Sequence, residues 1–266
     1  MSIQFQGAIR RCFLQTRTVG FPRFASSTSS KLWLKRQSKD PFVKLRAQDV
    51  YRSRSAYKLL EIDDKYRVLR QARTIVDLGA APGGWSEAAA RRTRQYMGRR
   101  NQPVIEDDES LDSTLRYDRS TSRIAIVAVD LLPIASIPGV HTIQGDFLSP
   151  QTQAQVTSVL DGRPVDVVLS DMCENMSGNR DRDSESSLQL CLAAFSFAKT
   201  HFEQTNRLRD PRRGVLIMKY FAHPDLDEFH KGIKPMFRRL EVFKPKSSRS
   251  DSSEVYLVCI GWKGGA

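Results

Sequence analysis

The segment that decides the fold is residues 74–87, which read TIVDLGAAPGGWSE. A short apolar run of β-type residues ends at Asp77, and a glycine-rich turn over 79–84 follows it. A helix is expected from Ser86 to about Arg94. In a doubly wound sheet, a turn of this kind lies at the carboxyl edge of the strands, where ligands bind. The segment therefore predicts a buried strand that delivers a ligand-binding turn.

The spacing of the glycines excludes two common phosphate-binding turns. The turn does not follow the G-x-G-x-x-G pattern of nicotinamide-dependent oxidoreductases, and no Lys-Ser/Thr pair follows the glycines as in a P-loop. A nucleoside-type ligand without a pyrophosphate fits this turn better. For two adjacent glycines alone, a purely structural turn is an equally good interpretation.

Three further apolar runs each deliver an acidic residue to the same predicted edge. Residues 124–129 precede Asp130, residues 142–147 contain Asp146 at the end of the predicted third strand, and residues 165–170 precede Asp171. An acid at the tip of the second strand is placed to accept hydrogen bonds from ribose hydroxyls. Each acid alone could be a turn residue, but three in succession favour a binding edge.

Three charged residues elsewhere in the sequence could have either a functional or a structural role. Lys58 lies on a predicted basic, amphipathic helix that begins near Ser53, Lys219 ends the apolar run 214–218, and Glu254 starts an alternating last strand over 254–260. A lone lysine at the end of a strand is usually a solvated charge. Spacing alone does not bring these residues together.

Four strings of the sequence resemble one known family. They are residues 51–62 (YRSRSAYKLLEI), 74–87, 170–178 (SDMCENMSG) and 244–256 (KPKSSRSDSSEVY). Together they resemble the FtsJ-type ribose 2′-O-methyltransferases, which use S-adenosyl-L-methionine. The resemblance covers roughly residues 45–262 apart from an insert.

The resemblance implies both a fold and a set of site residues. The fold is a Rossmann-like α/β domain with a seven-stranded, mostly parallel sheet, helices on both faces and an antiparallel last strand. The implied catalytic residues are Lys58, Asp171, Lys219 and Glu254, and the implied cofactor-binding residues are Gly83, Gly84, Trp85, Asp130, Asp146 and Asp171. Arg52 and Arg54 become candidate phosphate contacts.

The chain departs from the family at one loop of the predicted site. Cys173 and Glu174 replace an Ala-Pro pair, which removes a rigid proline and adds a negative charge where RNA would dock. This change concerns substrate positioning rather than the class of reaction. The protonation state of Lys219, as general base or as charged donor, is open at this stage, because its expected neighbours push its pKa in opposite directions.

The implied substrate is RNA. Within the family, the chain is most similar to members that methylate a uridine of mitochondrial large-subunit ribosomal RNA, so ribosomal RNA or the large subunit is the expected partner. A tRNA ribose methyltransferase and a ribosome-assembly factor with dispensable catalysis remain the alternatives. We expect a monomer, although nothing in the residues determines the oligomeric state.

The composition excludes some classes of protein but does not indicate a function. The 266 residues carry a formal net charge of +12, but residues 1–39 hold eight Lys/Arg and no Asp/Glu, which leaves only +4 for the remainder. No apolar run approaches the length of a membrane span. The four cysteines and four histidines show no ligand spacing, so no metal is predicted and free thiols are expected.

Two segments are predicted to lie outside the catalytic machinery. Residues 1–40 are predicted to be a mitochondrial transit peptide followed by a disordered arm, because residues 1–39 are rich in Arg and Ser and free of acids. A basic arm that contacts RNA is the alternative. Residues 98–122 are expected to be a variable surface insert in a methyltransferase domain that spans 41–266, and the matrix is the expected compartment.

Overall fold

The computed structural model describes residues 51–100, 124–173, 180–205, 213–221, 224–248 and 252–264. The boundary between the two units of the chain falls after Gln48, and every described residue belongs to the second unit. The predicted transit peptide, nearly all of the predicted insert and the segment from Glu174 to Gly178 lie outside these ranges. They stay predictions.

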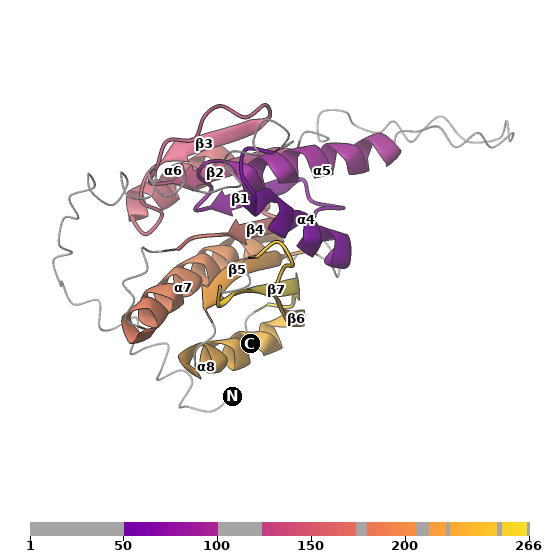
Figure 1. Ribbon diagram of the computed structural model, residues 1–266. Coiled ribbons are helices and arrows are strands. Elements are labelled where there is room, and N and C mark those ends of the chain that lie inside the picture. The colour runs from indigo at the N-terminus through magenta and orange to yellow at the C-terminus, as the bar shows by residue number, and fades with distance from the viewer. Residues whose placement is uncertain are drawn as a thin grey trace, which may run out of the picture. The chain divides into compact units, whose positions relative to one another are not determined.

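A seven-stranded sheet forms the centre of the described part, with strand order β3-β2-β1-β4-β5-β7-β6 (Figure 1). The strands are β1 Thr74–Leu78, β2 Ala125–Asp130, β3 Val140–Gln144, β4 Val167–Ser170, β5 Val215–Phe221, β6 Phe237–Phe243 and β7 Glu254–Trp262. The first five pair in parallel, whereas β7 runs antiparallel to both β5 and β6. The predicted fold class is confirmed.

Helices cover both faces of this sheet (Figure 1). Strand β1 is therefore buried along its whole length. The helices are α4 Ser55–Tyr66, α5 Gly84–Arg100, α6 Pro150–Leu160, α7 Arg180–Thr205 and α8 Pro224–Ile233. Side chains of a strand alternate between faces. Thus Ile75 packs with residues of α4 and α5, whereas Val76 and Leu78 pack with residues of α6 and α7.

Two elements differ from the sequence prediction. Helix α5 continues to Arg100 and buries Thr93 and Tyr96, so the polar stretch expected to start the insert at residue 98 is still helical there. Helix α6 was not predicted. Helix α8 stops at Ile233, where a 3₁₀ turn, Lys234–Met236, follows it. That turn contains a proline, which lacks the N–H needed to continue an α-helix.

Strand β5 extends beyond the predicted residues 214–218. Lys219 lies within the strand rather than at its end, because β7 pairs with β5 as far as Phe221. Lys219 is opposite Tyr256 in this pairing, and Phe221 is opposite Glu254. The antiparallel partner therefore brings a predicted catalytic residue of β7 close to the predicted catalytic lysine of β5.

The described ranges contain neither a helix long and apolar enough to cross a membrane nor a group of three or more His, Cys, Asp or Glu side chains able to hold a metal ion.

The buried carboxylate of Asp63 ties α4 to its surroundings. Its Oδ1 accepts a hydrogen bond from the Leu69 N–H at 2.8 Å, and its Oδ2 accepts one from the Tyr96 hydroxyl at 2.6 Å. Arg92 Nε lies 3.4 Å from Oδ2 and supplies the countercharge. One acidic side chain on α4 thus organises the turn after the helix and its contact with α5.

We predict that Asp63→Ala lowers the free energy of unfolding by about 3 kcal/mol, since it leaves the Tyr96 hydroxyl and the Leu69 N–H without their acceptor and removes the buried countercharge of Arg92. The neighbouring Asp64→Ala is the matched control. Asp64 also pairs with Arg92 but is 60% exposed, so its loss should cost less than about 1 kcal/mol. Chemical denaturation of both variants measures the difference, and equal effects would show that burial of Asp63 contributes nothing.

Candidate active site

The glycine-rich turn lies at the carboxyl edge of the sheet, between β1 and β2. The N–H groups of Gly79 and Ala80 donate to Val129 O at 2.9 and 3.1 Å. Gly79 has φ +72°, and a Cβ there would lie 2.8 Å from Met172 Cα, so only glycine fits. Gly83 has φ +108° and immediately precedes α5. The predicted strand, turn and helix are confirmed.

Asp130, predicted to bind the cofactor, also braces this turn. Its Oδ2 accepts a hydrogen bond from the Ala81 N–H at 2.8 Å, and its Oδ1 accepts one from the Leu132 N–H at 2.8 Å. Burial raises the pKa of this carboxyl above its ordinary value, although the two backbone donors act against that shift. Each oxygen keeps a lone pair that a hydroxyl could use.

The other predicted cofactor residues differ in how they can reach a ligand. Asp146 is exposed just beyond β3, and its Oδ1 accepts a hydrogen bond from the Leu148 N–H. Gly84 packs against Ser53, since a Cβ there would lie 2.0 Å from the Ser53 hydroxyl. The Trp85 side chain is 2% exposed and donates from its indole nitrogen to Ser55 O. Trp85 can therefore contact a ligand only through its backbone.

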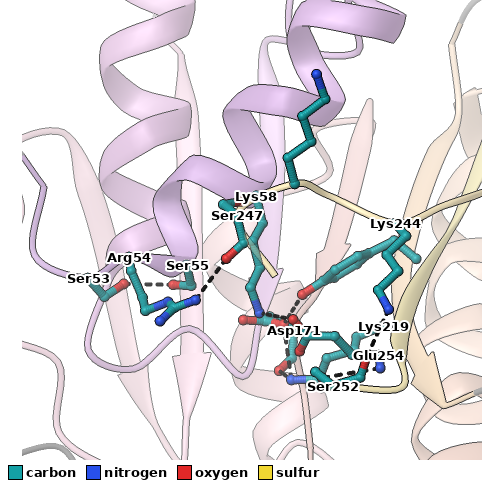
Figure 2. A network of polar contacts seen from close by, with 12 residues as sticks. Ser53, Arg54, Ser55, Lys58, Asp171, Lys219, Lys244, Ser247, Ser252 and Glu254 are labelled. Carbon is teal, nitrogen blue, oxygen red and sulfur yellow. Dashed lines mark hydrogen bonds and ion pairs between the residues drawn. The ribbon is translucent and has the colours of Figure 1, made fainter. Parts of the chain in front are cut away.

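The four predicted catalytic residues come together as two ion pairs (Figure 2). Lys58 Nζ of α4 lies 2.5 Å from Glu254 Oε1 at the start of β7. Lys219 Nζ of β5 lies 3.0 Å from Asp171 Oδ1 and donates to Asp171 O at 2.6 Å. All four side chains are 9–17% exposed. The structure thus brings together residues that are up to 196 positions apart in the sequence.

Tyr256 joins the two pairs and was missed by the sequence analysis. Its hydroxyl donates to Asp171 Oδ1 at 2.8 Å, and Lys58 Nζ lies 5.9 Å from the centre of its ring. Burial and the carboxylates of Asp171 and Glu254 raise the pKa of Tyr256 well above its usual value, so the phenol remains a donor. The signal was available, because residues two apart on a strand share a face and Glu254 was already singled out.

The surroundings of Lys219 determine its protonation state in the free protein. Burial alone lowers the pKa of an ammonium, but Asp171, Cys173 and Glu254 outweigh that effect and raise the pKa of Lys219. Lys219 is therefore protonated at neutral pH. The interpretation left open by the sequence is decided in favour of a charged hydrogen-bond donor.

A loop after β6 holds α4 against the site. The Glu61 carboxylate accepts hydrogen bonds from the N–H groups of Lys246 and Ser247 at 2.6 and 2.8 Å. Arg54 donates to Ser247 O at 2.9 Å. The Arg52 guanidinium donates to the carbonyls of Ala135 and Ser136. The two arginines proposed as phosphate contacts therefore have structural partners.

Asp77 is a second functional group that the sequence analysis did not single out. It lies within β1 and is completely buried, and its Oδ2 accepts a hydrogen bond from the Ser86 hydroxyl at 2.6 Å. Burial, aided by Asp171 and Asp130, raises its pKa from 3.8 to about 7, and the Ser86 hydrogen bond opposes the shift. The sequence could have indicated this residue by its position two residues before the first glycine of the turn.

Comparison with known proteins agrees with this geometry. A family model described as FtsJ-like methyltransferase matches residues 51–262. The chain belongs to the FtsJ-like methyltransferase family. A relative named ribosomal RNA large subunit methyltransferase E, from Pseudomonas aeruginosa, is 39% identical over 240 residues that cover 90% of this chain and 99% of that protein. The protein of the same name from Acinetobacter baumannii is 36% identical over 237 residues, 89% of this chain and 94% of its own length.

A solved structure supports the same family. A Plasmodium falciparum protein assigned as a ribosomal RNA methyltransferase superposes with a TM-score of 0.59 at 27% identity, covering 81% of this chain and all of that chain. The family resemblance inferred from the sequence strings is thereby confirmed.

The residues at the edge suit the sulfonium cofactor of such methyltransferases. Asp77, Asp130 and Asp171 all lie at or near the carboxyl edge, where negative charge favours a cationic ligand and repels the phosphates of a dinucleotide. The positive φ angles of Gly79 and Gly83 let the backbone approach a ligand closely. Asp130, Gly83 and Asp171 would hold S-adenosyl-L-methionine at this edge.

We predict that Tyr256→Phe lowers the rate of methyl transfer by about 10- to 100-fold, the loss expected for one hydrogen bond to a charged group. The Asp171 carboxylate would lose a donor and turn more fully toward Lys219. Single-turnover kinetics give the chemical step, and thermal melting verifies folding. A rate within threefold of wild type would show that the hydroxyl does not orient Asp171.

We predict that Asp77 makes stability fall as pH rises. Its folded pKa of about 7 exceeds the unfolded value near 3.8, so the folded state holds an extra proton between these values and loses that advantage from about pH 4 to pH 7. Between pH 5 and pH 8, wild type should lose about 3 kcal/mol more than Asp77→Asn, which cannot titrate. Chemical denaturation across this range measures the difference, and parallel curves would contradict it.

Proposed function

We propose that this protein transfers the methyl group of S-adenosyl-L-methionine to a ribose 2′-hydroxyl of large-subunit ribosomal RNA. The observation that carries the proposal is the joined pair of ion pairs, Lys58–Glu254 and Lys219–Asp171, beside the glycine-rich turn. Relatives that match nearly the whole chain are named for ribosomal RNA. A ribose hydroxyl is a poor nucleophile until its proton is partly removed, and a cluster of two ammonium and two carboxylate groups can do this.

The chain's residues would position the hydroxyl and take part in removal of its proton. The cofactor supplies a methyl group on a sulfonium, which is already a good leaving group. Lys219, protonated and held by Asp171, would donate a hydrogen bond to the 2′-oxygen and lower the pKa of the hydroxyl. As the oxygen–carbon bond forms and the carbon–sulfur bond breaks, the hydroxyl proton would leave to the Asp171 carboxylate or to water.

The second pair would act on the RNA backbone around the reacting ribose. Lys58 Nζ is bound to Glu254 and lies near the Tyr256 ring, so its remaining N–H bonds are held in a fixed direction. An ammonium in that position can orient the ribose by contact with a neighbouring oxygen. Glu254 pairs with Lys58 and limits the repulsion between the two lysines.

The finer proposal is a uridine of mitochondrial ribosomal RNA, with the protein in the matrix. The acid-free, Arg- and Ser-rich residues 1–39 support the compartment. A tRNA ribose methyltransferase is the nearest alternative within the reaction class, and an assembly factor with dispensable catalysis is the alternative outside it. The complete set of four catalytic residues disfavours a protein that has lost its activity.

We predict that Lys219→Ala lowers transfer of labelled methyl to below one tenth of the wild-type rate, because it removes the donor to the 2′-oxygen. The substrates are large-subunit ribosomal RNA, the assembled subunit and tRNA, and resistance of the labelled position to alkaline hydrolysis identifies a 2′-O-methyl group. Lys231→Ala, at an exposed lysine of α8, is the control and should keep wild-type activity.

The substrates separate the proposals. Label only in tRNA would overturn the ribosomal substrate but keep the reaction. Cofactor binding without label in any RNA would favour the assembly factor, and a Lys219→Ala rate above one tenth would remove Lys219 from the mechanism.

A further inference from the structure

A basic pocket lies at the opposite edge of the sheet from the active site. Its volume is about 420 Å³, within the range of small-ligand sites. Its walls are the turn after α4, the starts of β4 and β5, and parts of β6 and β7. The charged groups that line it are Arg67, Arg70, Arg213, Arg239 and Asp166.

The pocket is separate from the methyl-transfer site. Asp166 and Asp171 immediately precede and follow β4, so at about 3.3 Å per residue they lie about 16 Å apart. The pocket residues gather where the parallel strands begin, and the catalytic residues gather where these strands end. A ligand in the pocket would not contact the reacting atoms.

The lining has excess positive charge over an apolar floor. Four guanidinium groups face one carboxylate, and Val68, Ala72 and Val167 lie beneath them. An apolar floor lowers the local dielectric and strengthens the attraction of the arginines for an anion. Planar guanidinium groups, with several donors each, match the oxygens of a phosphate better than lysines would.

The arginines differ in how firmly they are held. Asp166 is occupied by the N–H groups of Arg73 and Thr74, and Arg213 Nη1 lies 3.6 Å from its Oδ1, beyond hydrogen-bond distance. Arg239 is bound to Glu241, so that carboxylate, just outside the lining, offsets its charge.

Arg67 and Arg70 retain the most binding capacity. Within the described ranges, the Arg67 guanidinium makes one hydrogen bond, a long one of 3.4 Å to the Tyr96 hydroxyl. Arg70 is exposed, and among the described residues its guanidinium makes no hydrogen bond or ion pair. Donors that are already placed at the mouth of a basic pocket, and not engaged elsewhere, are available to an anionic ligand.

We propose that this pocket binds the phosphate of a nucleotide, and that in the working enzyme this nucleotide belongs to the RNA substrate, at a point remote from the methylated ribose. The RNA source rests on the proposed function above. A free nucleoside phosphate offers the same chemistry to the same arginines and is the other source to be tested. Contact at both edges of the sheet would let the enzyme hold a folded RNA in one orientation.

The test is the double variant Arg67→Glu/Arg70→Glu of the full chain. Both side chains are exposed, so folding should survive, which thermal melting verifies. With large-subunit ribosomal RNA as substrate, KM should rise about tenfold or more while kcat at saturating RNA stays unchanged. The slope of log Kd against log salt should fall by about 1.5, as for two lost phosphate contacts. Lys231→Glu/Lys234→Glu, at two exposed lysines, is the charge-matched control and should change none of these quantities beyond about twofold.

A second arm distinguishes the sources. ATP and inorganic phosphate are added to wild type and to the double variant, and the melting temperature is recorded. A stabilisation that only wild type shows, with unchanged KM for RNA, would assign the pocket to a free phosphate compound. If neither RNA affinity nor phosphate stabilisation changes in the double variant, the proposal is overturned.

The outcome is independent of the reaction itself. Lys219→Ala should abolish methyl transfer while keeping wild-type RNA affinity and its salt dependence. If wild type and every variant lacked methyl-transfer activity, the proposed function would be contradicted. If only the difference in salt dependence between wild type and the double variant were absent, the RNA-binding role of the pocket would be contradicted.

Discussion

The structure depends on the pairing of four charges in a nearly dry site. Lys58, Asp171, Lys219 and Glu254 are each at least 83% buried, and an unpaired charge in such a place costs several kcal/mol. Pairing requires that α4, β4, β5 and β7 meet at one edge of the sheet. The antiparallel β7 supplies Glu254 and Tyr256 from one face, and the site exists only when that strand is in register with β5.

Helix α4 carries Lys58 of this site. It lies outside the sheet, so contacts other than strand pairing must hold it in place. The Trp85 indole donates to Ser55 O near its start, Glu61 binds the loop after β6, and Asp63 binds the following turn and α5. Apolar residues of α4 fill the core below. These contacts explain why Trp85 is buried, although the motif suggests a direct role in cofactor binding.

The two edges of the sheet have opposite electrostatic character. Acidic side chains gather at the carboxyl edge, where Asp77 is kept partly protonated near neutral pH by burial. Arginines gather at the other edge, over the starts of β4 and β5. A cationic cofactor suits the first and a phosphate suits the second. The modest net charge of residues 40–266 therefore hides a strong asymmetry between the two edges of the sheet.

The amino-acid sequence was sufficient to predict the family and the sheet, and to propose a set of catalytic residues. Continuous apolar runs identified β1, β2 and β4, since buried parallel strands are apolar on both faces, and the glycine turn was recognisable because its backbone conformation demands glycine. The motif strings selected Lys58, Asp171, Lys219 and Glu254. Helix α6 was missed because its local pattern was weak.

The pKa values and hydrogen-bond partners of these residues depend on the tertiary structure. The pKa of Lys219 depends on the distances to Asp171 and Glu254, which no spacing in the sequence contains. The roles of Tyr256, Glu61 and Asp77 likewise depend on partners 85, 185 and 9 residues away. Arg52 and Arg54 seemed available for RNA until folding gave them carbonyl partners. Electrostatic energies and hydrogen bonds depend on separation in space and on burial, and chain folding alone determines both.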